Sequence, residues 1–143
     1  MDWQTYIIRL AISIMIGGLI GIEREFEHKP AGLRTIILVC LGSTIFMLIG
    51  IELGGIGQAR IVAGIITGIG FLGAGAIIRA KGEVYGLTTA ATIWLASGLG
   101  IAVGAGYYFL ATLATLSVLV VLRILGFIER KLPKRKVHSG DTS

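Results

Sequence analysis

Residues 61–78 read IVAGIITGIGFLGAGAII, a run of apolar and small residues without a single charged side chain. A helix that crosses the hydrocarbon core of a bilayer needs roughly 20 mainly apolar residues, each adding 1.5 Å of length. The run is therefore typical of a membrane-spanning helix. Four more stretches of this kind occur along the chain, and the predicted spans cover residues 3–22, 35–53, 61–78, 87–103 and 107–128.

The composition excludes an ordinary water-soluble domain. Hydrophobic residues make up 55% of the 143 positions, which would leave a soluble protein of this length with far too much exposed apolar surface. We predict an all-α integral membrane protein, a compact glycine-rich bundle of five transmembrane helices over residues 1–129 with a basic tail over 130–143. The first span has no basic segment before it and no small-residue cleavage site after it, which favours a retained helix over a signal peptide.

The distribution of positive charge predicts the orientation. If the N-terminus is outside, one basic residue, Arg60, lies in the outer loops, whereas the inner segments hold Arg24, Lys29, Arg34, Arg79, Lys81 and the basic tail. Cytoplasmic loops are enriched in Lys and Arg, so five spans with an outside N-terminus and a cytoplasmic C-terminus are expected. This bias also explains the net charge of +5 without a nucleic-acid partner.

Glycine is the most informative residue inside the spans. The chain holds 22 glycines, and small residues allow helices to approach closely in lipid. The predicted packing residues are Gly17, Gly21, Gly64, Gly68, Gly70, Gly73 and Gly75. We expect the third helix at the centre of the bundle, packed against the first and fourth, although some of these faces could join copies in a homo-oligomer. The G-x-G-x-x-G match at residues 68–73 lies inside a span, so a dinucleotide site is excluded.

With this topology, the ends of four helices bring polar residues to one level at the cytoplasmic surface. These residues are Glu23, Arg24, Glu25, Arg34, Thr35, Arg79, Thr88 and Thr89. Arg79 is expected to end the third helix. Three interpretations remain open. The first is an anion site. A small anion or an anionic lipid headgroup would be bound by Arg34, Arg79 and the N-terminus of the fourth helix, which Thr88 or Thr89 would cap.

The second interpretation is a cation held by Glu23 and Glu25, although carboxylates two residues apart on a helix do not face each other. The third is an ion-pair network of Glu23, Arg24, Arg34 and Arg79 that ties the helix ends together. Away from this cluster, Arg9 lies inside the first span, where it either extends to the headgroups or has a buried partner.

No other constellation indicates catalysis. No Ser/His/Asp or Cys/His grouping is present, His28 and His138 are isolated, and the lone Cys40 is expected to be a packing residue. We therefore expect no enzymatic activity, no metal site and no cofactor.

Four blocks of sequence, in order, resemble the MgtC/SapB family of bacterial inner-membrane proteins. They are GGLIGIERE at 17–25, KPAGLRT at 29–35, GIGFLGAG at 68–75 with Arg79, and GLTTAATIW at 86–94. The resemblance implies a multi-pass protein linked to adaptation to low magnesium and, in pathogens, to survival in host cells. It also implies that the eight polar residues above are the candidate functional positions. Many relatives carry a soluble C-terminal domain, in place of which this chain has a short basic tail.

Two functions follow from this resemblance and from the residues. The first is a non-enzymatic regulator of other membrane machinery, whose cytoplasmic cluster binds a headgroup, a small anion or a protein partner. The alternative is a small transporter or channel for magnesium, another ion or a small solute.

Overall fold

A computed structural model describes residues 1–80 and 83–131 of the chain, without the side chains of 79, 80, 83, 129 and 130. The elements in order are α1 (Trp3–Phe26), α2 (Leu33–Leu53), α3 (Gly55–Gly75), β1 (Ile78–Ala80), β2 (Glu83–Tyr85), α4 (Leu87–Gly104), α5 (Tyr108–Val120), the π-helical turn η1 (Val121–Leu125) and α6 (Gly126–Lys131). Within these residues five helices are long and apolar enough to cross a membrane, α5 continuing to Ile128. The predicted five-helix membrane fold is confirmed.

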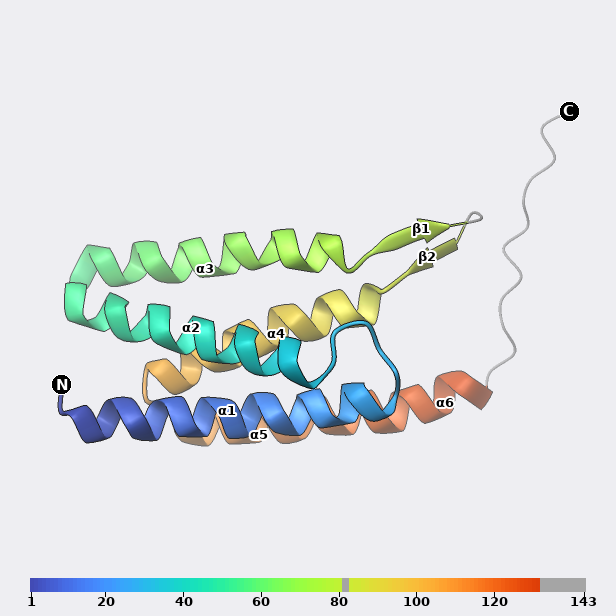
Figure 1. Ribbon diagram of the computed structural model, residues 1–143, viewed down its shortest axis with the longest axis horizontal. Helices are drawn as coiled ribbons and strands as arrows, with labels where there is room; N and C mark the ends of the chain where they lie inside the picture. The colour runs from blue at the N-terminus through green and yellow to red at the C-terminus, as the bar shows by residue number, and fades with distance from the viewer. Residues whose placement is uncertain (81–82, 132–143) are drawn as a thin grey trace, which may run out of the picture.

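The helices run up and down the long axis of the molecule, which gives the bundle two distinct ends (Figure 1). Gly54 (φ 67°) joins α2 to α3, and Gly106 (φ 86°) precedes α5, because glycine adopts positive φ without a Cβ clash. We call the end with these two connections the turn end. The opposite end, here called the hairpin end, holds the end of α1, the starts of α2 and α4, and the β1–β2 hairpin. Its predicted cytoplasmic location stays a prediction.

The core lies where α2 packs against α1 on one side and α4 on the other. Gly17 and Gly21 of α1 adjoin the backbone of α2: a Cβ on Gly17 would lie 2.9 Å from the Cα of Ile37, and one on Gly21 would lie 2.8 Å from the Cα of Leu33. Gly104 of α4 allows the same approach, because its Cβ would lie 2.7 Å from that of Met47. These glycines let three helices pack almost backbone to backbone.

The third helix is not central, and this part of the sequence analysis is wrong. Within the single chain, Gly73 is the one buried residue of α3. A Cβ on Gly73 would lie 3.8 Å from that of Ala90 on α4, whereas Gly64, Gly68, Gly70 and Gly75 have nothing within 4 Å. Small residues permit close approach, but they do not determine which helix approaches them.

The third span also begins six residues earlier and ends three residues earlier than predicted. The helix begins at Gly55 and ends at Gly75, so Arg79 does not end it but lies in β1, paired with Val84 of β2. Gly73 and Gly75 weaken the helix, and the β-branched Ile77 and Ile78 that follow suit an extended strand. The antiparallel hairpin pairs Ile78 with Tyr85 and Ala80 with Glu83.

Candidate functional site

The hairpin end gathers the ends of the elements that hold the eight predicted site residues. Residues 23–25 lie in the last turns of α1, 34–35 in the first turn of α2, 79 in β1, and 88–89 in the first turn of α4. The side chain of Arg79 lies outside the described part of the structure. Of the other seven side chains, Glu23, Arg24 and Thr89 are buried, and Glu25 is exposed but hydrogen-bonded to the start of α2. The remaining three, Arg34, Thr35 and Thr88, are exposed.

Arg24 and Thr89 form a buried contact between α1 and α4. Arg24 is 3% exposed and Thr89 is 2% exposed, and Nη2 of Arg24 donates a 3.1 Å hydrogen bond to Oγ1 of Thr89. Neither Thr88 nor Thr89 caps α4, contrary to the sequence analysis. The N-cap is Gly86 (φ 88°), so both threonines lie within the first turn, where Thr89 accepts from Arg24.

Glu25 holds the start of α2. Its Oε2 accepts a 2.9 Å hydrogen bond from the backbone N–H of Leu33, the first residue of that helix. The N-cap of α2 is Gly32, which offers no side-chain acceptor, so the carboxylate of Glu25 takes this role from the preceding helix. A negative charge here also favours the helix dipole. A Cβ on Gly32 would collide with the Glu25 carboxylate in its present position, so a larger residue there would shift that side chain.

Glu23 does not pair with Glu25 around a cation in this arrangement. Glu23 is 4% exposed, whereas Glu25 is exposed and is bonded to Leu33. Among the described residues, no group of three or more His, Cys, Asp or Glu side chains could hold a metal ion. Two buried atoms of this region, Oε2 of Glu23 and Nε of Arg24, have no hydrogen-bond partner in the described chain. Burying such an atom destabilises the fold unless water or a bound group forms a hydrogen bond with it.

Arg34, Thr35 and Thr88 form the exposed set, and Lys29 is exposed beside them in the α1–α2 connection. They belong to elements that Arg24, Thr89 and Glu25 join to one another. We call these four exposed residues the exposed platform. They offer two cations and two hydroxyls, and the helices that hold them are joined by side chains that are buried or hydrogen-bonded within the chain. Such a surface can bind a phosphate, a carboxylate or an anionic headgroup.

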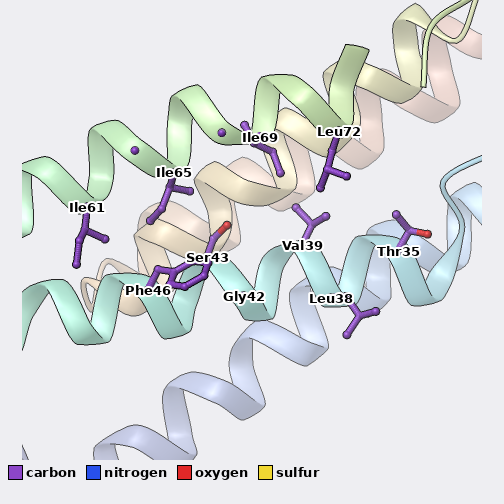
Figure 2. Close-up of a pocket in the computed structure, with 12 residues that line it drawn as sticks. Thr35, Leu38, Val39, Gly42, Ser43, Phe46, Ile61, Ile65, Ile69 and Leu72 are labelled. Atoms are coloured by element: carbon purple, nitrogen blue, oxygen red, sulfur yellow. The ribbon is translucent and has the colours of Figure 1, made fainter. Parts of the chain in front are cut away.

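An apolar groove between α2 and α3 was not predicted. A cavity of about 660 Å³ is lined by both helices from Thr35 to Phe46 and from Ile61 to Leu72. Figure 2 shows its side chains and the separation of the two helices. A second cavity of about 490 Å³ extends it toward the hairpin end and shares Thr35, Val39 and Leu72. Gly42, Gly64 and Gly68 of this lining have nothing within 4 Å of an added Cβ, so the missing side chains leave part of the groove open.

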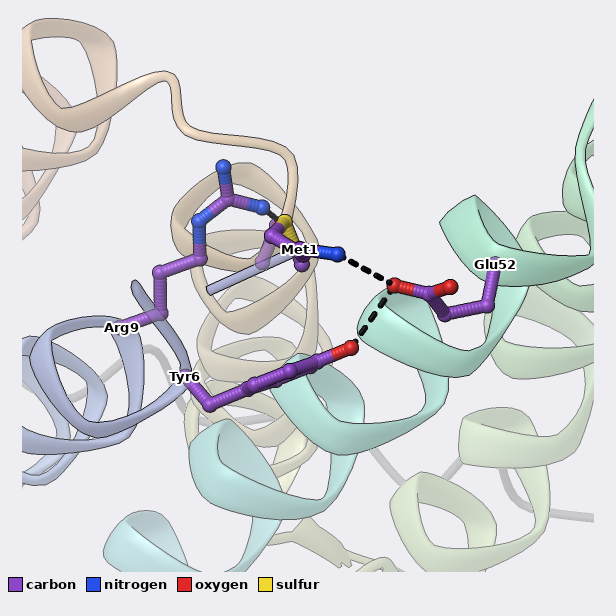
Figure 3. Close-up of polar contacts among 5 residues, drawn as sticks. Met1, Tyr6, Arg9 and Glu52 are labelled. Atoms are coloured by element: carbon purple, nitrogen blue, oxygen red, sulfur yellow. Dashed lines mark hydrogen bonds and ion pairs between the residues drawn. The ribbon is translucent and has the colours of Figure 1, made fainter. Parts of the chain in front are cut away.

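The turn end has its own polar contacts, which Figure 3 shows. The hydroxyl of Tyr6 donates a 2.7 Å hydrogen bond to Oε1 of Glu52, and the Met1 amine lies 3.6 Å from the same atom. Arg9 has partners within the protein: Nη1 donates to the carbonyl oxygen of Gly104, and Nε donates over 3.2 Å to the hydroxyl of Tyr108. Of the two accounts of Arg9, the partnered one therefore holds, although the partners are a carbonyl and a phenol and not a carboxylate.

The chain is similar to several known bacterial proteins. The sequence profile of the MgtC family matches residues 10–131. "Putative magnesium transporter YhiD" of Escherichia coli (strain K12) is 35% identical over 142 residues, which cover 93% of this chain and 66% of YhiD. "Protein SapB" of Bacillus subtilis (strain 168) is 37% identical over 94% of this chain and 62% of SapB.

"Protein MgtC" of Salmonella typhimurium (strain LT2) is 43% identical over 114 residues, 80% of this chain and 49% of that protein. The chain thus spans between about half and two thirds of the length of these relatives. No solved structure matches it. The blocks of sequence, the five apolar helices and these matches lead to one conclusion: the chain belongs to the MgtC family and is a multi-pass protein of the bacterial inner membrane.

Proposed function

We propose that this protein is a non-enzymatic membrane regulator in adaptation to low magnesium, and that it acts on other membrane proteins through the exposed platform at the hairpin end. One observation carries the proposal. Arg24, Thr89 and Glu25 are hydrogen-bonded within the chain, while Arg34, Thr35, Thr88 and Lys29 are exposed at the same end and their side chains form no hydrogen bond with these three. A partner can therefore bind these charged side chains without breaking the hydrogen bonds that hold the helices together. The link to magnesium rests on membership of the family and on the name of YhiD.

The middle of the bundle supports regulation over conduction. The hydroxyls of Ser43 on α2 and Ser97 on α4 share a 2.8 Å hydrogen bond, and Thr44 donates over 2.9 Å to the carbonyl oxygen of Gly100. All three hydroxyl-bearing residues are at most 4% exposed. Polar groups at this depth usually line a pathway when they are open to water. Here they are bonded to one another across α2 and α4.

Growth under magnesium limitation tests the proposal. The protein is expressed in a bacterial strain that lacks its own MgtC-family genes, and growth is compared at low and high magnesium. We expect the R34Q/T35V variant to lose the growth benefit while its membrane level stays unchanged. R60Q is the matched control, because Arg60 is an exposed arginine on α3 near the turn end. Equal growth with R34Q/T35V and wild type would contradict a role for the platform.

Transport is the second candidate, favoured by the printed name of YhiD. Purified protein in vesicles that enclose a magnesium-sensitive dye distinguishes the two functions. A regulator supports growth without moving magnesium across the vesicle membrane. Magnesium flux above that of protein-free vesicles, lost in a variant that also fails to support growth, would establish the transporter instead.

A further inference from the structure

We propose that the groove between α2 and α3 binds one acyl chain of an anionic phospholipid, with the lipid phosphate held by Arg34 and Thr35 at the mouth of the groove. This inference rests on the proposed function, because it assigns a ligand class to the exposed platform. It also gives a role to the apolar cavity, which the platform alone does not explain.

The shape of the groove gives it a closed end and an open end. At the turn end, α2 and α3 are joined by the single residue Gly54, and a Cβ on Gly50 would lie 3.4 Å from the Cα of Gln58. From there the helices diverge toward the hairpin end (Figures 1 and 2). Near Gly73, α3 packs against α4 instead. A chain can therefore enter the groove at the hairpin end and stop before the turn.

The lining suits a hydrocarbon chain. Apart from Thr35 and Ser43, the larger cavity is bordered by aliphatic side chains, phenylalanine and glycine. The hydroxyl of Ser43 already bonds Ser97 on α4, which leaves Thr35 as the polar residue at the mouth. Both helices are apolar enough to lie in the bilayer, where lipid chains are the surrounding solvent.

Charge complementarity identifies the headgroup. Arg34 precedes Thr35 in the first turn of α2 and is exposed, as is Lys29 in the connection before it. Arginine and lysine side chains attract phosphate oxygens. The first N–H of α2 is already bonded to Glu25, so the attraction comes from these two side chains.

Near the closed end, Arg60 is the exposed cation, and the carboxylate of Glu52 is bonded to Tyr6 and pairs with the Met1 amine. Among the described residues, the hairpin end therefore offers two cations and the hydroxyl of Thr35, against one cation near the closed end. The anionic head of a lipid is therefore favoured at the hairpin end.

A helix from a second copy of the chain fits this groove less well. A transmembrane helix is about 10 Å wide with its side chains and continues through the whole bilayer. The one-residue connection at Gly54 blocks its path at the turn end. A flexible single chain can end inside a groove that narrows, so we commit to lipid as the occupant.

Native mass spectrometry of protein taken from vesicles of equal parts phosphatidylglycerol and phosphatidylcholine tests the inference. We expect wild-type protein to retain one phosphatidylglycerol in preference to phosphatidylcholine. In R34Q this preference should fall about fivefold, as expected for one basic residue beside an anionic lipid. G68L should lose retained lipid of both kinds, because the leucine fills the cavity.

The matched control for G68L is G70L. Both glycines lie on α3 with nothing within 4 Å of an added Cβ, but only Gly68 lines the groove. G70L should therefore retain lipid like the wild type, and R60Q should keep its preference for phosphatidylglycerol. Inorganic phosphate added in millimolar excess should not release the lipid, since a free anion has no acyl chain.

Three results would overturn the inference: equal retention of both lipids by the wild type, normal lipid retention in G68L, or release of the lipid by phosphate. A dimer that disappears in G68L while retained lipid is unchanged would assign the groove to a second copy. These outcomes are separate from the growth test. A protein whose growth benefit depends on Arg34 and Thr35, but which retains no lipid, would keep the proposed function and lose this ligand.

Discussion

Thr44 of α2 donates a 2.9 Å hydrogen bond to the carbonyl oxygen of Gly100 on α4. The contact is possible because Gly100 has no side chain: an added Cβ would collide with the carbonyl oxygen of Cys40 and would lie 2.8 Å from Cβ of Ser43. The two central helices therefore meet through backbone and small polar groups, and the following prediction tests that contact.

The G100A variant should be destabilised by about 1–3 kcal/mol, the usual cost of forcing a methyl group into a packed interior. Cys40 is the one cysteine of the chain and is fully buried, so a thiol-reactive dye reports unfolding in detergent during heating. G98A is the control, because Gly98 lies on the same helix with nothing within 4 Å. Equal melting temperatures for the two variants would contradict the close packing of α2 and α4.

The T89V variant should also be destabilised, by about 1–3 kcal/mol, because it removes the hydroxyl that accepts from the buried guanidinium of Arg24. T89S keeps an acceptor and should recover most of the stability. T88V makes the same change one residue away at an exposed position and should melt like the wild type. If T88V and T89V have the same melting temperature in the dye assay, the hydrogen bond between α1 and α4 does not stabilise the fold.

Arg9 should stabilise the turn end through its two hydrogen bonds to Gly104 and Tyr108. We expect R9Q to lower stability by about 1.5–3 kcal/mol, the range for hydrogen bonds from charged groups. R9K should recover only part of this loss, because one ammonium cannot reproduce the planar fork of arginine. R123Q replaces an exposed arginine in η1 and should have little effect on the melting temperature.

Cysteine labelling in intact cells tests the orientation. A59C at the turn end should react with a membrane-impermeant maleimide added from outside, whereas H28C at the hairpin end should react only after the cells are permeabilised. The buried Cys40 should leave the wild type unlabelled in both conditions. Labelling of H28C in intact cells would place the exposed platform outside the cytoplasm and would remove the basis for a cytoplasmic partner.

The sequence predicts the number of helices well, because the length of an apolar run is set by the thickness of the bilayer. It also places residues 23–25, 34–35 and 88–89 at one end, since successive spans cross the membrane in alternating directions. The hairpin was missed because Ile77 and Ile78 continue the apolar run of the third span. An apolar pair at this point fits a strand as well as a helix.

The division of the polar cluster into buried and exposed residues depends on helical phase. Gly17, Gly21 and Arg24 are spaced by four and three residues, so they share one face of α1, and all three are buried. This pattern could have identified Arg24 as a core residue. The position of α3 could not be found in this way, because its small residues recur on several faces and give no direction for packing.

The single-residue connection at Gly54 makes α3 a lever. Near its other end α3 contacts α4 at Gly73, so a change in the spacing between α2 and α3 would tilt α3 about Gly54 by shifting that contact. Over a 21-residue helix roughly 30 Å long, a tilt of about 10° would displace the β1–β2 hairpin by about 5 Å. A change in the spacing of α2 and α3 inside the bilayer would in this way move the β1–β2 hairpin at the membrane surface.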